Sequence, residues 1–414
     1  MTRLVLIGGG VATTATATGL REAGFDGDIV LVADEPHLPY ERPPLSKEFL
    51  AGTFTHADFQ VNQESWYRDN EVELLLGTRA EGIEVAERRV SLSDGRSLTY
   101  DALVLGTGVR ARTLPGFGGD RVHVVRTIAD STRLAQRLAP GCHLAILGAG
   151  FIGCEVAAVA AARGVRVTIF DPNPLPLARV LGPEIGSAMI GIHGDHGVDI
   201  RTGEVVTDMT ETGSGIVLRT RDGELVECDE LLVGIGSVPN VELAAEAGLE
   251  VDGGILTDQY GRTSVPDVYA IGDVAERFHP AHGRRVRVEH HETAMRHGAN
   301  LARNLLGEPE PFTEEHFFWT HQYEHNVQSL GQFTGEGTPV ARGSVEERSF
   351  SVFSLLNGRI RAMVALDRPR DVLQARKLMA VPHEITEEQL ADEGFQLKSL
   401  LPQKAGARRS EVRR

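Results

Sequence analysis

Cysteine is scarce in this 414-residue chain, which contains only three. They are Cys142, Cys154 and Cys228, and they lack the close spacing of a CxxC pair, a zinc site or an iron–sulfur site. This spacing argues against a disulfide framework, a metal cluster and a dithiol redox centre. We expect three reduced thiols in a cytoplasmic protein.

Hydrophobic runs are also short. The tightest apolar stretch, Val156–Ala162, has seven residues, whereas a helix needs roughly 18 to span a bilayer. Near the N-terminus, Gly8 interrupts the apolar run Leu4–Ile7, and a signal peptide needs about 7–15 apolar residues. We therefore expect no membrane segment, and we interpret the N-terminus as that of the mature protein.

Basic residues are in deficit. The chain has 42 of them against 58 acidic residues, a net charge of −16. An acidic chain binds nucleic acid poorly unless its basic residues cluster, so no nucleic-acid partner is expected. Glycine is abundant, at 46 residues, but forms no low-complexity tract, so it needs local explanations.

Short apolar runs alternate with helical stretches, which predicts βαβ units and parallel sheets. Two similar units stand out, each a strand, a glycine turn, a helix and a second strand. Their predicted elements are Leu4–Ile7, Thr13–Ala23 and Ile29–Val32, then Leu144–Leu147, Ile152–Arg163 and Val165–Phe170. The fold class expected is α/β, with two Rossmann-like dinucleotide-binding domains.

A different pattern begins after about residue 311. Three antiparallel strands and a helix are predicted there, at Phe317–Trp319, Phe350–Leu355, Ile360–Ala365 and Val372–Met379. Before them, the strand Val268–Ile271 runs into Gly272-Asp273, and a helix is expected at Thr293–Leu306. We divide the chain into an FAD domain in two parts (1–112 and 237–313), an NAD domain (113–236) and a C-terminal α+β interface domain (314–414). The last ten residues are expected to be a frayed tail.

The first glycine turn predicts a phosphate cradle. Gly8, Gly10, Val11 and Ala12 lie between a strand and a helix, where small residues let a pyrophosphate approach backbone N–H groups. Asp34, just after the second strand, is placed to hold a ribose diol. Thr13 replaces the third glycine of GxGxxG, so a simple tight turn remains an alternative.

The second turn carries the complete motif, Gly148-Ala149-Gly150-Phe151-Ile152-Gly153. Asp171 closes its second strand, where a carboxylate accepts from a ribose 2′-hydroxyl and repels a 2′-phosphate. No arginine occurs at 172–176, which favours NADH over NADPH. Two such units predict two dinucleotides, a retained FAD and an exchanging nicotinamide. Asp273, after a strand ending in glycine, is predicted to bind the flavin ribityl chain.

Several motifs carry a resemblance to a known family. LPYERPPLSK (38–47), GAGFIGCEVA (148–157), LARVLGPEIG (177–186), GIGSVPN (234–240) and RPRDVLQARKL (368–378) resemble FAD-dependent ferredoxin reductases. These include putidaredoxin- and rubredoxin-reductase-like enzymes, which feed haem monooxygenases and Rieske dioxygenases. The resemblance covers essentially the whole chain and implies the glutathione-reductase fold.

The resemblance also implies site residues. Lys47 and Glu155 match a catalytic pair beside the flavin. The positions that match FAD-binding positions of the family are Ala12, Asp34, Lys47, Ala80, Arg126 and Asp273, and those that match its NADH-binding positions are Glu155 and Asp171. Further cofactor-binding candidates are Arg42, Thr107, Arg179, Gly236, Glu289, His290, His291 and Trp319. The family often has EHW where this chain has Glu289-His290-His291, a doublet closer to apoptosis-inducing-factor-type flavoproteins. It also has an acid where this chain has His321.

The function expected is hydride transfer from NADH to FAD, then single-electron transfer to a small acidic [2Fe–2S] ferredoxin that supplies an oxygenase. Transient docking to an acidic partner needs a positive patch. The candidates are Arg284, Arg285, Arg287, Arg296, Arg359, Arg361, Arg368, Arg370, Arg376 and Lys377. The alternatives are a redox-sensing protein of the apoptosis-inducing-factor type and an NADH oxidase. A monomer and a homodimer are both open, and Cys154, beside Glu155, is expected to be unreactive.

Overall fold

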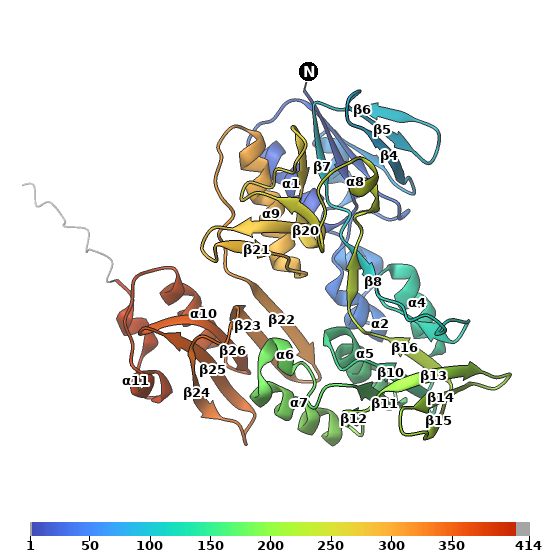
Figure 1. Ribbon diagram of the computed structural model, residues 1–414, viewed down its shortest axis with the longest axis vertical. Coiled ribbons are helices and arrows are strands. Elements are labelled where there is room, and N and C mark those ends of the chain that lie inside the picture. Colours follow the sequence, from blue (N-terminus) through green and yellow to red (C-terminus); the bar gives the residue numbers. More distant parts are fainter. Residues whose placement is uncertain (1, 403–414) are drawn as a thin grey trace, which may run out of the picture.

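The computed structural model describes residues 2–402, apart from the side chain of Arg179. Three lobes are visible (Figure 1), one above and two below. The predicted frayed tail lies outside the described residues. None of the described helices is both long and apolar enough to cross a membrane.

The upper lobe is built on a five-stranded parallel sheet with strand order β19-β7-β1-β2-β3. Its central strand β1 is fully buried from Leu4 to Ile7, as the apolar run requires for a sheet covered on both faces. The element bounds are β1 Arg3–Ile7, α1 Val11–Glu22, β2 Asp28–Val32, β3 Val72–Leu75, β7 Ala102–Leu105 and β19 Val268–Ala270. The predicted unit is confirmed, with small shifts at its ends.

The lower lobe with the green chain repeats this plan, with strand order β12-β11-β10-β16-β9. The central strand again runs through a glycine turn into a helix. The bounds are β9 Val122–His123, β10 His143–Leu147, α5 Phe151–Ala162, β11 Arg166–Asp171, β12 Asp199–Thr202 and β16 Glu230–Val233. The second predicted unit is therefore also confirmed.

Each parallel sheet carries a three-stranded antiparallel meander that the sequence analysis did not predict. The strands are β4 Ala80–Glu84, β5 Arg89–Leu92 and β6 Ser97–Thr99 in one lobe, and β13 Val206–Glu211, β14 Ile216–Thr220 and β15 Leu225–Cys228 in the other. A third small sheet contains β18 Ile255–Thr257, β20 Ala275–His279 and β21 Arg284–Val286.

The chain passes between these two lobes twice, and the two passages pair with each other. Strands β8 (Val109–Ala111) and β17 (Ser237–Pro239) form an antiparallel ribbon. Beside it, Thr107 Oγ1 donates to the carbonyl of Asn240 at 2.7 Å, and Asn240 Nδ2 donates to the carbonyl of Thr107 at 2.8 Å. These bonds join the two passages at the edge of the space between the lobes.

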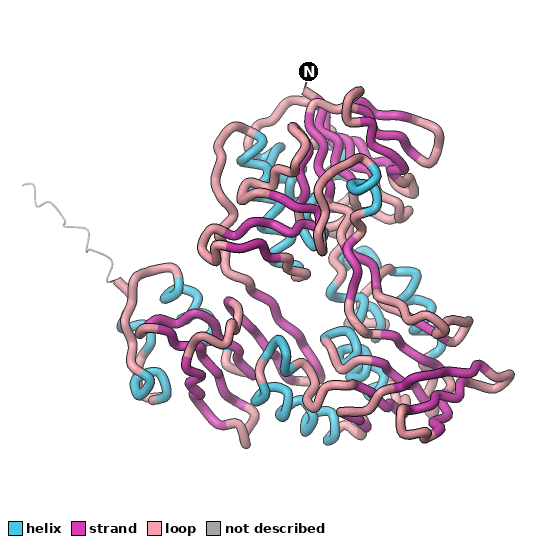
Figure 2. The backbone as a smooth tube through the Cα atoms, in the orientation of Figure 1, coloured by secondary structure: helices cyan, strands magenta, loops and turns pink. Residues whose placement is uncertain are grey.

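The third lobe is a five-stranded antiparallel sheet, β22-β23-β26-β25-β24, packed on helix α10. Its first strand descends from the upper lobe (Figure 2) and packs against α5 of the second lobe. The bounds are β22 Phe317–Gln322, β23 His325–Gly331, β24 Thr338–Ser344, β25 Ser349–Leu356, β26 Arg359–Leu366 and α10 Pro369–Met379. The antiparallel strands and the helix predicted here are confirmed.

The remaining helices connect these sheets. They are α2 Glu48–Ala51, α3 Glu64–Asp69, α4 Ile128–Arg137, α6 Ala178–Leu181, α7 Pro183–Asp195, α8 Glu242–Glu246, α9 His291–Leu305 and α11 Glu387–Ala391, with 3₁₀ turns at Pro43–Ser46, His56–Phe59, Gly272–Val274 and Leu397–Leu400. Helix α9, predicted at Thr293–Leu306, packs along α1. The two helices approach so closely at Gly298 that no side chain fits there. A Cβ on Gly298 would lie 2.0 Å from the carbonyl oxygen of Ala12.

Candidate active site

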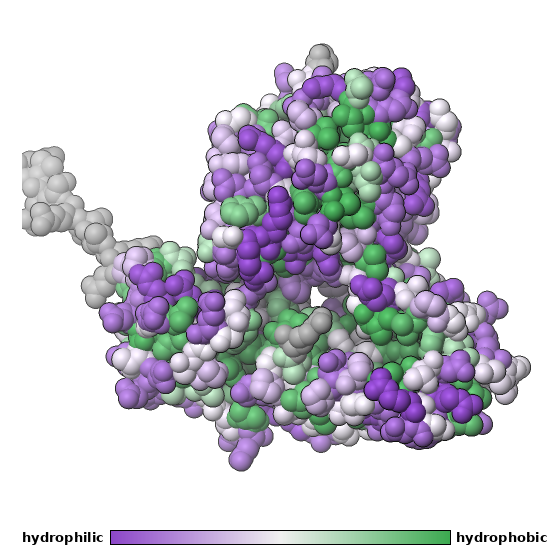
Figure 3. Space-filling model, viewed as in Figure 1, coloured by the Kyte–Doolittle hydropathy of each residue, from purple (hydrophilic) through white to green (hydrophobic). Residues whose placement is uncertain are grey.

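One large cavity, of about 1260 Å³, lies where the lobes meet. It exceeds the roughly 300–1,000 Å³ of a typical small-molecule site. The space-filling view is hollowed between the upper and lower lobes (Figure 3), with hydrophobic residues on the lower wall. Apart from Arg179, which lies in α6 with its side chain outside the description, every site residue predicted from the sequence lines this cavity.

The first glycine turn is shaped by backbone contact. Gly8 has φ +124°, and a Cβ on it would lie 2.2 Å from the carbonyl oxygen of Gly106. A Cβ on Gly10 would meet only open space. Thr13 stands in place of the motif's third glycine, and its hydroxyl donates to the Gly8 carbonyl at 2.6 Å. Its methyl group packs on Gly106, where a Cβ would lie only 2.5 Å from it. The departure from GxGxxG therefore tightens the turn.

The second glycine turn has the same geometry. Gly148 has φ +100°, and a Cβ on Gly153 would lie 2.0 Å from the Gly148 carbonyl oxygen, so the third glycine is required here. Asp171 is buried, and its Oδ2 accepts from the Ala149 N–H at 2.7 Å. Its Oδ1 accepts from the backbone and side-chain N–H groups of Asn173. A carboxylate has about four acceptor sites, so Asp171 braces the turn and keeps capacity for a ribose hydroxyl.

The starts of α1 and α5 have no side-chain cap. Neither N-cap glycine provides a side-chain cap, and neither first turn contains an acid. By contrast, α4 and α11 begin with complete capping boxes at Thr127 and Thr386. An uncapped helix start presents backbone N–H groups and a positive dipole end. Two such starts in one cavity fit the two diphosphates of FAD and a nicotinamide dinucleotide.

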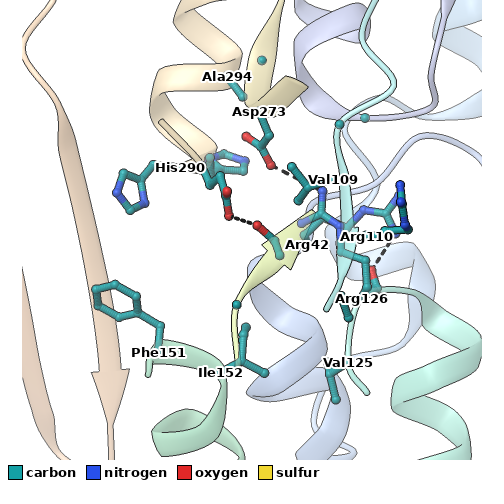
Figure 4. Close-up of a pocket in the computed structure, with 18 of the residues that line it drawn as sticks. Arg42, Val109, Arg110, Val125, Arg126, Phe151, Ile152, Asp273, His290 and Ala294 are labelled. Carbon is teal, nitrogen blue, oxygen red and sulfur yellow. Dashed lines mark hydrogen bonds and ion pairs between the residues drawn. The ribbon is translucent and has the colours of Figure 1, made fainter. Parts of the chain in front are cut away.

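Charged side chains surround the first helix start (Figure 4). Arg126 Nη2 lies 3.4 Å from Asp273 Oδ2. Burial raises the pKa of Asp273, and the Arg126 guanidinium opposes this shift. Arg42 is held by an ion pair with Glu35 at 2.7 Å and by the Arg126 carbonyl at 2.8 Å. Asp34 is exposed, and no described residue bonds its carboxylate, so it is open to a ribose diol.

A largely buried ion pair lines the same cavity as the two helix starts. Lys47 Nζ is 3.0 Å from Glu155 Oε2, and the side chains are 12% and 5% exposed. The same carboxylate accepts from Ser46 Oγ at 2.5 Å and from Thr320 Oγ1 at 2.7 Å. The predicted pairing of Lys47 with Glu155 is thus present in the structure, with two hydroxyl donors that the sequence analysis missed.

Aromatic rings form one wall of the cavity. The His290 ring stacks on Phe318, with centroids 4.3 Å apart, and both contact Phe151. Desolvation lowers the pKa of His290 to about 4. Trp319 also lines the cavity, in an edge-to-face contact with His291. Figure 4 places Phe151 and His290 on one side of the cavity and the arginines on the other.

His321, which replaces an acid of the family pattern, does not join this wall. Along β22 the buried side chains are Phe318, Thr320 and Gln322, while His321 is exposed. His321 shares its strand face with Trp319, but it lies further along β22 and does not line the cavity. The cavity therefore keeps its lining despite the change.

The cysteines take no part in the cavity's chemistry. Cys154 is fully buried, and burial, with Glu155 nearby, raises the pKa of its thiol above the usual range. Burial also raises the pKa of Cys142 to about 11 and that of Cys228 to about 12. Within residues 2–402 all three are unpaired, and no cluster of His, Cys, Asp and Glu could hold a metal ion. The raised pKa of the Cys154 thiol agrees with the expectation that Cys154 is unreactive.

Comparison with known proteins identifies the fold family. Residues 2–298 match the pyridine nucleotide-disulphide oxidoreductase model, and residues 317–401 match the reductase C-terminal model. This chain belongs to the pyridine nucleotide-disulphide oxidoreductase family. Family membership agrees with the fold and with the two dinucleotide cradles.

The relatives are similar over nearly their whole length. Rhodocoxin reductase of Rhodococcus erythropolis is 37% identical, over 99% of this chain and 96% of its own. The anthranilate 1,2-dioxygenase system ferredoxin–NAD(+) reductase component of Burkholderia cepacia is 40% identical, over 96% and 98%. Putidaredoxin reductase, in the crystal structure of its covalent complex with putidaredoxin, is 34% identical with a TM-score of 0.93, over 96% of this chain and 98% of that one.

Proposed function

We propose that this protein is an NADH-dependent ferredoxin reductase. It takes a hydride from NADH onto FAD and delivers electrons singly to a [2Fe–2S] ferredoxin that supplies a monooxygenase or dioxygenase. The observation that carries the proposal is that the uncapped starts of α1 and α5 face one cavity, which the Lys47–Glu155 ion pair also lines. One relative named above is the ferredoxin–NAD(+) reductase component of a dioxygenase system, and another is putidaredoxin reductase in a complex with putidaredoxin, which supports the same activity.

The residues of the first lobe are suited to hold FAD. The turn at Gly8–Gly10 would receive the diphosphate, and Asp34 the adenosine ribose. Arg126 and Asp273 would bind the polar chain between the diphosphate and the ring. A bound flavin accepts a hydride from a nicotinamide and passes electrons on singly.

The residues of the second lobe are suited to hold NADH. The turn at Gly148–Gly150 would receive its diphosphate. Asp171 would accept from the ribose 2′-hydroxyl and repel a 2′-phosphate, so NADH is favoured over NADPH. Lys47 would present its ammonium to the ring, where a positive charge stabilises negative charge that develops on reduction. The apolar wall of Phe318 and Trp319 would exclude water from the reacting faces.

The partner we propose is a small acidic iron–sulfur ferredoxin that binds transiently. The structure narrows the candidate basic patch, because several of its arginines already have acidic partners within the chain. Arg296 and Arg376 both pair with Glu292. Arg287 pairs with Glu289. Arg368 pairs with both Asp371 and Glu393. No ion pair joins the other candidates to a described residue; these are Arg284, Arg285, Arg359, Arg361, Arg370 and Lys377.

Stopped-flow reduction tests the function. The purified protein should be yellow with bound FAD, and NADH should bleach the flavin faster than NADPH does. Cytochrome c should then be reduced only when a [2Fe–2S] ferredoxin is present, and rising salt should weaken this reaction, since the Debye length is about 8 Å at physiological ionic strength. A colourless protein that cannot be reconstituted with FAD would contradict the proposal.

The same experiment separates the alternatives. A long-lived charge-transfer complex with slow turnover would favour the redox-sensing type, to which the doublet His290-His291 is similar. Oxygen as the sole acceptor would favour an NADH oxidase. We place the reaction in the cytoplasm, where three unpaired cysteines and a supply of NADH are both expected. Whether the protein works as a monomer or a homodimer is decided by light scattering.

A further inference from the structure

A line of buried polar side chains leads away from the ion pair. Thr320 Oγ1 lies 2.7 Å from Glu155 Oε1, and Gln322 Nε2 lies 3.2 Å from Thr320 Oγ1. Gln322 Oε1 is 2.9 Å from His193 Nε2, and His193 Nδ1 is 3.0 Å from the Tyr323 hydroxyl. Thr320 and His193 have no exposed surface, and Gln322 is 2% exposed. The line connects β22 of the third lobe with α5 and α7 of the second.

The donors in this line all point toward the carboxylate. The Glu155 carboxylate, paired with Lys47, accepts from the Thr320 hydroxyl, which in turn accepts from Gln322 Nε2. Burial raises the pKa of Tyr323, so its hydroxyl keeps its proton and is available to donate to His193 Nδ1. Desolvation lowers the pKa of His193 to about 4, so the ring is neutral. Its Nε2 faces the Gln322 oxygen, which can only accept, so the proton lies on Nε2 and Nδ1 accepts. That N–H donates to Gln322 Oε1, which orients the amide so that its N–H₂ donates to Thr320. The Thr320 hydroxyl is then left to donate to Glu155.

Other ionisable groups near the far end do not reverse this direction. The His196 ring stacks on Tyr323 with centroids 3.6 Å apart, and its positive form disfavours protonation of His193. Cys154 and Glu324 face Tyr323, and both contribute to raising the pKa of Tyr323. The surroundings therefore favour a neutral His193 and a protonated Tyr323.

The line is not a route for protons. A primary amide stands in its middle, and it cannot pass a proton on while keeping its bonds. A buried polar line is costly unless it is fully satisfied, and apolar residues on this face of β22 would pack against α5 without that cost. We therefore infer that these side chains do more than pack β22 against α5, because their hydrogen bonds all donate toward the Glu155 carboxylate of the candidate site.

We propose that Thr320, Gln322 and His193 are positioning residues that hold the Glu155 carboxylate toward Lys47 for reduction of the flavin by NADH. This inference rests on the proposed function. Lys47 lies between the 3₁₀ turn Pro43–Ser46 and α2, which both pack on α5, whereas Thr320 comes from the third lobe. The geometry of the pair therefore depends on how the third lobe packs on the second.

The test compares two similar threonines. Thr320→Val removes the donor to Glu155 at nearly constant volume, and Thr320→Ser restores a hydroxyl. The control is Thr168→Val, since Thr168 is a buried threonine of the second lobe that bonds only His143 and lies outside the cavity. The rate of flavin reduction by NADH is measured from pH 4 to 8.5. The acid limb of the profile should move to higher pH in Thr320→Val, because a hydrogen bond that favours the charged carboxylate is lost, and return in Thr320→Ser.

A second readout needs no turnover. In ¹⁵N-histidine NMR of the FAD-loaded protein, the resonance lost in His193→Gln should show a proton on Nε2 and a bare Nδ1 down to about pH 5. A proton on Nδ1, or a pH profile that is unchanged in Thr320→Val or equally shifted in Thr168→Val, overturns the proposal. If Thr320→Val does not fold, the histidine spectrum of the wild type decides. If NADH fails to reduce the wild-type flavin, the proposed function fails. The histidine spectrum still tests whether the hydrogen bonds from Tyr323 to Glu155 all donate toward the carboxylate.

Discussion

The buried pair Lys47–Glu155 should show strong energetic coupling. At 3.0 Å and an effective dielectric constant of about 20, two unit charges attract each other by about 5.5 kcal/mol. Part of this attraction offsets the loss of hydration of both groups. Removing one partner leaves the other charge buried and uncompensated, which typically costs about 3–5 kcal/mol.

A double-mutant cycle measures the coupling. Lys47→Met and Glu155→Gln should each lower the free energy of unfolding by about 3 kcal/mol in urea denaturation of the FAD-loaded protein. The double variant should lose clearly less than the sum, with a coupling energy of about 2–3 kcal/mol. The exposed pair Arg68–Asp69, at 74% and 63% exposure, is the control and should show well under about 1 kcal/mol. Additive losses at Lys47 and Glu155 would refute the reasoning, because they would mean that the two charges do not depend on each other.

Three further predictions follow from other parts of the structure. Asp171→Asn should lower the ratio of kcat/KM for NADH over NADPH by about tenfold or more, because it removes the charge that repels a 2′-phosphate; an unchanged ratio would remove the specificity argument. Asp273→Asn should weaken FAD retention by about 10–100-fold in dialysis, as expected for one charge-assisted bond, whereas Asp267→Asn, at an exposed pair with Arg88, should not. Stability should fall as the pH drops from about 6.5 toward 4, because buried histidines with lowered pKa values bind their protons only on unfolding, each contributing about 1.4 kcal/mol per pH unit. These histidines, with pKa values of about 4, 4, 3 and 3, are His193, His279, His297 and His316. A melting temperature constant from pH 7 to 5 would contradict this expectation.

The two dinucleotide units could be predicted because their signals are local. A short apolar strand, a glycine turn and a helix lie within about 20 residues, and each element's own pattern specifies it. The same locality explains why Gly8, Gly148 and Asp171 could be singled out, since each stands at a fixed place in the βαβ unit. The meanders β4–β6 and β13–β15 were missed because their strands are short and half-exposed, so their alternation is weak.

The bracing of the site could not be predicted for a different reason. Glu35 beside Arg42, Asn240 beside Thr107, and Thr320 beside Glu155 are partners across 7, 133 and 165 residues. A threonine or glutamine on a half-buried strand is compatible with either face, and only the packing of β22 on α5 decides which one is buried. Tertiary contacts of this kind leave no periodic signal in the sequence.

The cavity also shows how this chain uses a disulphide-oxidoreductase fold without a redox thiol. Disulfide reductases of this fold need paired cysteines after the first helix or in the NAD domain, and here the first of these segments holds Arg42–Lys47. The only cysteine beside the second helix start, Cys154, is buried and holds its proton tightly. The position next to it is Glu155, whose carboxylate binds Lys47 instead. With this charged pair and no second cysteine beside Cys154, the cavity lacks the dithiol of the disulfide reductases. In the function proposed above, the electrons from NADH would therefore leave from the cofactor itself.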